Sequence, residues 1–220
     1  MDPVPAVTGP STRAATPPGA ATADDIAGIV RDYDAFARLQ DPVRAAQHGD
    51  AAARRRWPDN SPAAVEARRL ALQGFGERLA AARPVAPGST DGLNHELLAD
   101  RVATDLEALR FDEERMPFIS GDGFYTTADY AALNTVLNGE ADAEAWLARL
   151  AAIPAYYRTE TANMARGIAT GFTQPRRTVE RAIADARAQA EQPAADSPLL
   201  APFATLPESL PAPQRASLPS

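Results

Sequence analysis

The first residues that could do chemistry are two histidines, one of which forms the pair His95-Glu96. The helix of a zinc peptidase carries His-Glu-x-x-His, because two imidazoles one helical turn apart can bind the same metal ion. Here the fifth position is Ala99, and the other histidine, His48, lies in a different segment. We therefore expect no metal-binding residues in this chain, and we interpret His95-Glu96 as a polar pair near a helix start.

Two reactive residue types are absent. The sequence contains no cysteine, and all 22 basic residues are arginine. These absences exclude thiol chemistry, cysteine zinc sites, a P-loop lysine and a Schiff-base lysine. No serine lies in a Gly-x-Ser-x-Gly elbow, and Gly121-Asp122-Gly123 is too short for a dinucleotide fingerprint. We expect no catalytic and no cofactor-binding residues, and so no cofactor, in this chain.

Charge and hydropathy narrow the class of protein further. The net charge is −7, and an acidic chain repels the phosphate backbone of nucleic acids. The single basic run, Arg54-Arg55-Arg56, precedes Trp57-Pro58 and is typical of a solvated helix end. No apolar run approaches the ~20 residues needed to span a bilayer. We therefore predict a soluble protein with neither a nucleic-acid partner nor a membrane span.

One loop is unusual because it keeps apolar and aromatic side chains where loops are normally polar. It covers residues 116–126, between two helical patterns. Either it folds onto its own core, or it lines a ligand cleft or docks on another domain. Under the second reading the candidate cleft-lining residues are Phe118, Gly121, Asp122, Phe124 and Tyr125.

The elements around this loop have a helical period, and no stretch alternates like a strand. Thr22 resembles a helix cap, Ser61-Pro62 is an N-cap with proline at the first position, and Thr127 is placed to cap a short helix. Pro154 is expected to kink or restart the helix that contains it, and Pro175 to begin the last one. The pattern predicts an all-α fold of about seven helices in an orthogonal or bundle-like arrangement.

Proline placement sets the boundaries of the predicted domain. Prolines are dense in the first 18 residues and again from residue 193. We expect a disordered leader at 1–21, a helical domain at 22–192, and a proline-rich extended tail at 193–220.

Several runs resemble a bacterial family known as domain of unknown function 885. The similarity extends in order from about residue 23 to residue 203, including Leu93–Leu97, and is carried by four further runs: Arg110–Phe118, Ser120–Phe124, Ala148–Tyr157 and Arg166–Arg176.

The resemblance implies a larger, mostly helical protein similar to zinc metallopeptidases, which are hydrolases. The metal motif expected in such relatives, His-Glu-x-x-Pro-Gly-His, would lie after the region present here and is absent from this sequence. No catalytic or metal residue can therefore be carried over. Zinc is expected in a missing C-terminal part, and the chain is either a fragment or a truncated homologue.

Two functional hypotheses follow. In the first, the chain is the N-terminal, cleft-forming region of a metallopeptidase-like protein, with the C-terminal part and a peptide substrate as partners. In the second, it is a stand-alone helical interaction or scaffold module without enzymatic activity. By resemblance to exported relatives we expect a periplasmic location, with the cytoplasm as the alternative.

Overall fold

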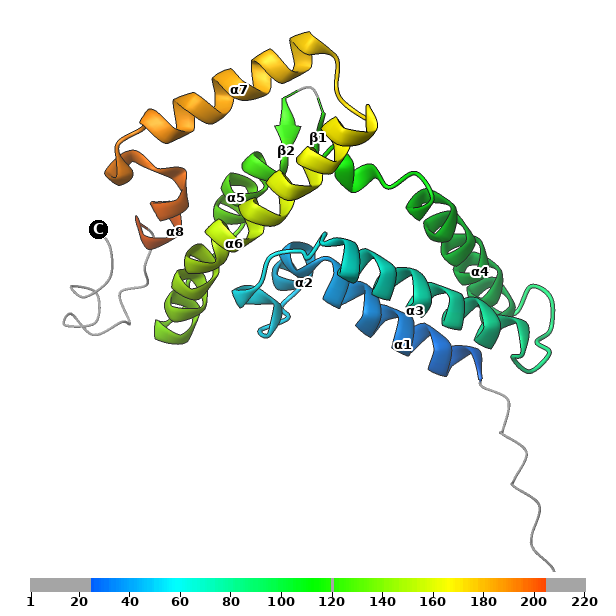
Figure 1. Cartoon of the computed structure of the whole chain (residues 1–220). Helices are drawn as coiled ribbons and strands as arrows, with labels where there is room; N and C mark the ends of the chain where they lie inside the picture. Colours follow the sequence, from blue (N-terminus) through cyan, green and yellow to red (C-terminus); the bar gives the residue numbers. More distant parts are fainter. Residues whose placement is uncertain (1–24, 120, 205–220) are drawn as a thin grey trace, which may run out of the picture.

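The computed structural model describes residues 25–119 and 121–204, and within them the fold is all-α, as predicted (Figure 1). No helix in these ranges is both long and apolar enough to cross a membrane. The α-helices are α1 (Ile26–Gln40), α2 (Pro42–Gln47), α3 (Pro62–Ala80), α4 (Thr90–Leu109), α5 (Phe124–Leu133), α6 (Glu140–Thr170), α7 (Arg176–Glu191) and α8 (Ala201–Ala204). Short 3-10 turns are η1 (Ala53–Arg55), η2 (Glu113–Arg115), η3 (Ala194–Asp196) and η4 (Pro198–Leu200).

The helix starts follow the capping residues closely. Ser61 Oγ accepts a hydrogen bond from the Ala64 N–H at 3.3 Å, and Pro62 occupies the first turn of α3, as predicted. α1 begins at Ile26, where the Asp25 carboxylate accepts from the Gly28 N–H at 2.6 Å. The cap predicted at Thr22 lies outside the described residues.

Helix α5 begins three residues earlier than the cap predicted at Thr127. Its N-cap is Gly123, whose N–H donates to Thr126 Oγ1 at 3.1 Å. The helix ends at Leu133, where the side chains of Asn134 and Thr135 bond back to its last carbonyls. Thr135 Oγ1 donates to Ala131 O at 2.7 Å, which competes with continuation of the helix.

Pro154 neither ends nor restarts a helix. It lies inside α6, which is 31 residues long and continues on both sides of the proline. Proline cannot donate to the carbonyl four residues earlier, so one backbone bond of the helix is absent at this point. The burial of Trp146 and Tyr156 on either side of Pro154 holds the helix against its neighbours. Packing therefore outweighs the local preference of the proline.

Two hydrophobic cores form among the described residues, and the helices around them occupy different parts of the fold (Figure 1). Helices α1, α3 and α4 pack as a three-helix bundle around Ile26, Ile29, Leu72, Phe75, Leu79, Leu98 and Val102. Helices α5 and α6, with α2 and α8, enclose a second core. The buried residues of that core are Val43, Trp57, Ala128, Ala131, Ala132, Leu137, Ala143, Trp146, Tyr156 and Phe203.

The first part of the predicted extended tail is folded onto the second core. Residues 193–204 form η3, η4 and α8, and Phe203 is only 6% exposed. The Trp146 indole N–H donates to Leu199 O at 2.9 Å and fixes this segment to α6. Residues 205–220 and the predicted leader at 1–21 lie outside the described residues.

Candidate binding cleft

A cleft of about 460 Å³ lies where the elements of the two cores meet, beneath the loop that follows α4. The turn before α3 contributes Asn60, and η2 contributes Glu114. The loop forms one wall, and α6 provides Tyr156 and Glu160 on the opposite side. Side chains from both halves of the chain therefore meet in one hollow.

Three of the five predicted cleft-lining residues are placed in this cleft by the structure: Phe118, Asp122 and Phe124. Gly121 is exposed and lies beside the Arg181 guanidinium instead. Tyr125 is 5% exposed and belongs to the buried side of α5, so it does not line the cleft. A role for these side chains in ligand binding stays a prediction.

A two-residue hairpin shapes the loop. β1 (Phe118–Ile119) and β2 (Asp122–Gly123) pair antiparallel, with Phe118 opposite Gly123. A Cβ atom at Gly123 would lie only 2.5 Å from Phe118 Cβ, so no side chain fits there. The Gln174 side-chain amide, just before α7, donates to Phe118 O at 2.7 Å. Glycine and glutamine together thus hold Phe118 at the cleft.

The turn at η2 is fixed to α6 by an ion pair. Asp112 has a left-handed φ of 49°, a conformation that side-chain-bearing residues rarely adopt. The Arg166 guanidinium donates two hydrogen bonds, of 2.8 and 3.1 Å, to the Asp112 carboxylate. This bidentate geometry makes an arginine–carboxylate pair strong. A Cβ at the next residue, Gly167, would lie 2.5 Å from Arg115 O. The turn can therefore pack directly on the helix backbone.

Glu160 is the distinctive residue of the cleft. It is fully buried, and its Oε1 accepts a hydrogen bond from Asn60 Nδ2 at 2.8 Å. Its second oxygen, Oε2, has no hydrogen-bond partner among the described residues. A buried polar atom without a partner costs about 1–3 kcal/mol, so such an atom in a residue that lines a cleft points to a place for a ligand group.

The amide of Asn60 is held in a fixed orientation. Asn163 Nδ2 donates to the Asn60 backbone carbonyl at 2.8 Å. The Arg68 guanidinium faces Asn60 Oδ1 at 3.5 Å and bonds Glu114 Oε1 at 3.3 Å. The Nδ2 group of Asn60 is consequently directed at Glu160. The cleft is preorganised around this carboxyl group.

Burial raises the pKa of the Glu160 carboxyl above its usual range, and the nearby Glu114 and Asp59 raise it further. The side-chain amides of Asn60 and Asn163 act in the opposite direction without cancelling this effect. Glu160 can therefore donate a proton to a ligand in its neutral form, or accept from a cationic group in its ionised form.

Glu160 was not among the residues singled out from the sequence, although a signal for it exists. Tyr156, Glu160, Asn163 and Gly167 follow one another at helical spacing and are all buried in α6. A carboxylate and an amide on the inward face of a helix require polar partners. Polar residues at positions that the helical period assigns to the buried face could therefore have indicated the site.

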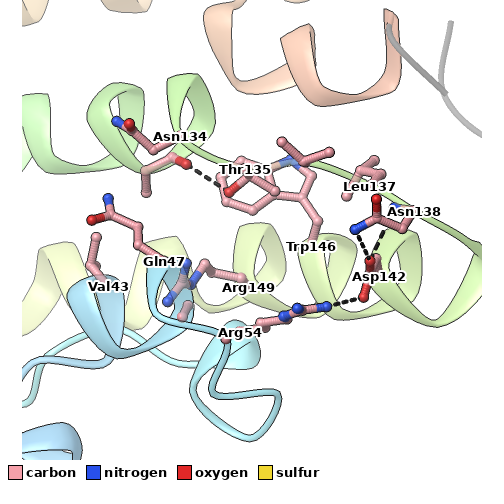
Figure 2. A pocket seen from close by; sticks show the side chains of 14 residues that line it. Val43, Gln47, Arg54, Asn134, Thr135, Leu137, Asn138, Asp142, Trp146 and Arg149 are labelled. Carbon is pink, nitrogen blue, oxygen red and sulfur yellow. Dashed lines mark hydrogen bonds and ion pairs between the residues drawn. The ribbon is translucent and has the colours of Figure 1, made fainter. Parts of the chain in front are cut away.

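A second, smaller hollow of about 190 Å³ lies between α2 and the junction of α5 with α6 (Figure 2). There Asp142 is fully partnered, because Arg54 bonds one carboxylate oxygen and the Asn138 backbone N–H bonds the other at 3.0 Å. Figure 2 shows both residues directed at this carboxylate. The carboxylate of this hollow is therefore closed by its own partners.

A larger groove of about 850 Å³ runs along α1. The polar groups that line it also bind one another: the Asp105 carboxylate accepts from the Tyr33 hydroxyl at 3.1 Å and from Arg101 Nε at 2.9 Å. The cleft of Glu160 differs from both hollows by its unpartnered buried oxygen.

Neither histidine lines the cleft. His95 Nε2 lies 3.1 Å from Leu79 O, and His48 is exposed at the end of α2. Among the described residues no group of three or more histidine, aspartate or glutamate side chains is arranged to hold a metal ion.

Fold and cleft together define an all-α protein with a hollow lined by residues from both helical parts. The chain belongs to the family described as bacterial protein of unknown function, DUF885, whose model matches residues 42–219. No curated protein and no solved structure matches this sequence.

Proposed function

We propose that this chain is the N-terminal helical region of a metallopeptidase-like protein, and that the cleft of Glu160 binds part of its substrate. The observation that carries the binding role is the unpartnered Oε2 of a fully buried carboxyl group at the cleft. The link to peptidases rests on the sequence resemblance described above.

In this proposal the cleft supplies binding and orientation. Phe118, Phe124 and Tyr156 provide apolar surface, while Asn60 and Glu160 provide a fixed pair of polar groups. Binding sites commonly combine mostly apolar walls with a few placed polar groups in this way. Activation of water on a metal would belong to a His-Glu-x-x-Pro-Gly-His stretch outside this sequence.

A retention experiment tests the binding role. The 220-residue chain is immobilised and exposed to a defined pool of short synthetic peptides, and the retained peptides are quantified by mass spectrometry. We expect Phe124→Ala to reduce retention at least ~10-fold, about 1.4 kcal/mol. Phe111→Ala is the matched control, since Phe111 is 55% exposed and lies outside the cleft.

Two results would overturn the proposal. Wild type that retains no peptide, or Phe124→Ala that retains as much as wild type, would remove the cleft as a substrate site. The peptidase link has a separate test in the DNA that follows the coding region. Absence of a His-Glu-x-x-Pro-Gly-His stretch from the same reading frame and its neighbours would favour a helical module without enzymatic activity.

A further inference from the structure

The charges that line the cleft are all of one sign. Four carboxyl groups line it, from Asp41, Glu114, Asp122 and Glu160, and none of its described lining residues is basic. Arg68, a cation beside the cleft-lining Glu114, is engaged by that carboxylate and by Gln40 Oε1 at 3.0 Å. A ligand group that enters the cleft therefore meets negative potential without a free positive charge.

From this arrangement we infer that the cleft selects an organic cation, a primary ammonium or guanidinium group, with Glu160 Oε2 as its acceptor. The inference rests on the proposed binding role of the cleft. A cationic donor would satisfy a buried oxygen that the described residues leave unpaired, and an ionised acceptor makes that bond stronger than a neutral one.

The walls of the cleft fit the same class of ligand. Phe118, Phe124 and Tyr156 bring aromatic rings to the cleft, and aromatic faces attract ammonium and guanidinium groups. The volume of about 460 Å³ accommodates a cationic side chain together with its backbone. An amino acid residue with a positive charge, at the amino terminus or on a side chain, combines these features.

Binding of a cation should also displace a proton. The charged groups around Glu160 are Glu114 from η2, Asp59 from the turn before α3, and Asp122 from the hairpin, with Arg68 neutralising Glu114. Burial raises the pKa of the Glu160 carboxyl, which favours its protonated form. A cation favours the ionised carboxylate, so its binding releases this proton and becomes tighter as the pH rises through the pKa of Glu160.

Calorimetric titration of the 220-residue chain with three small probes tests the inference. The probes are L-phenylalaninamide with a free ammonium group, N-acetyl-L-argininamide with a guanidinium group, and neutral N-acetyl-L-phenylalaninamide. We expect at least one cationic probe to bind ~10-fold or more tightly than the neutral probe. The tighter cationic probe identifies the source of the charge as a peptide amino terminus or an arginine side chain.

Variants assign the effect to Glu160. Glu160→Gln should remove the preference for the cationic probes, whereas Glu144→Gln, an exposed carboxylate of the same helix, should keep it. A second measurement needs only wild type. Titration of N-acetyl-L-argininamide in buffers of different ionisation enthalpy should show proton release, since the guanidinium group itself stays protonated.

Equal binding of neutral and cationic probes, or a preference for the cationic probes that survives in Glu160→Gln, would overturn the cation inference and leave the cleft as a peptide site. Failure of all three probes while the peptide pool is still retained would also overturn the cation inference alone. Failure of the probes together with loss of peptide retention would overturn the proposed function as well.

Discussion

Trp57 and Arg149 hold each other across the interface between the η1 segment and α6. The Trp57 indole N–H donates to Arg149 O at 2.7 Å, while Arg149 Nε donates to Arg56 O at 3.0 Å. The guanidinium carbon also lies 5.2 Å from the centre of the Trp57 ring. This reciprocal pair fixes the segment that leads into Asn60 and hence into the cleft.

We expect Arg149→Lys to destabilise the protein by about 2–4 kcal/mol, because a lysine ammonium cannot reproduce the planar fork of an arginine. Arg149 Nη2 bonds both Pro42 O and Ala53 O, at 2.9 and 3.0 Å. Denaturant melts followed by helix content give the measurement. Arg158→Lys, at an exposed position of the same helix, should change stability by less than ~0.5 kcal/mol. Equal midpoints for the two variants would contradict the structural role of Arg149.

The contribution of Glu160 to the free energy of unfolding should fall as the pH rises above 4.5, the ordinary pKa of a glutamate side chain. In this range the unfolded chain has lost the Glu160 proton while the folded chain still binds it, so raising the pH favours unfolding. Glu160→Gln has no such proton, and its free energy of unfolding should depend less on pH. Urea midpoints of both proteins from pH 4 upward check this. Parallel pH profiles would show that Glu160 has no raised pKa.

The hairpin should not tolerate a methyl group at Gly123. Gly123→Ala should cost about 1–3 kcal/mol, the usual range for overpacking, because the new Cβ would meet Phe118 Cβ at 2.5 Å. Gly74→Ala is the matched control, since nothing lies within 4 Å of its Cβ position inside α3. That variant should gain about 0.5–1 kcal/mol from helix propensity. If Gly123→Ala left the free energy of unfolding unchanged, the hairpin would have to move freely enough to accept the methyl group.

Phe203→Ala should cost about 3–5 kcal/mol, the range for a buried phenylalanine. Phe203 is 6% exposed and packs with the second core, although it follows a proline-rich sequence. Phe111→Ala at an exposed position should cost little by comparison. A loss below ~1 kcal/mol at Phe203 would show that the segment 193–204 contributes nothing to the fold.

The chain should not retain stoichiometric zinc after exposure to zinc and dialysis, and should show no peptidase activity on its own. His95 lies against the Leu79 carbonyl and His48 lies in another helix, so neither has a second imidazole one turn away. Elemental analysis after dialysis measures the metal content. One zinc per chain that disappears in His95→Ala would refute this expectation.

Much of the fold could be predicted from local patterns. Caps such as Ser61 and starts such as Pro175 depend on neighbours in the sequence, and both mark helix boundaries in the structure. The two strands of the hairpin could not be predicted, because two-residue strands have no measurable period. The folding of Phe203 onto α6 depends on long-range packing, which proline content does not reveal.

The cleft was only partly predictable, because it too depends on packing between segments far apart in the sequence. The aromatic loop was recognisable, since Phe118 and Phe124 are unusual in a loop. Glu160 and Asn60 lie 100 residues apart in the sequence, and each is an ordinary residue in its own segment. Only the packing of α6 on the turn before α3 makes them a pair, and no local pattern records that contact.

Under the proposed binding role, the position of the cleft between the two cores would couple ligand binding to the cooperative unfolding of both cores. The turn carrying Asn60 leads into the three-helix bundle, and Glu160 belongs to the helix that crosses the second core. A ligand held by both groups binds only when both halves are folded and docked, so mass action stabilises the docked state. Occupancy would therefore join two structural halves into one unfolding unit, and would transmit a change in either half to the other.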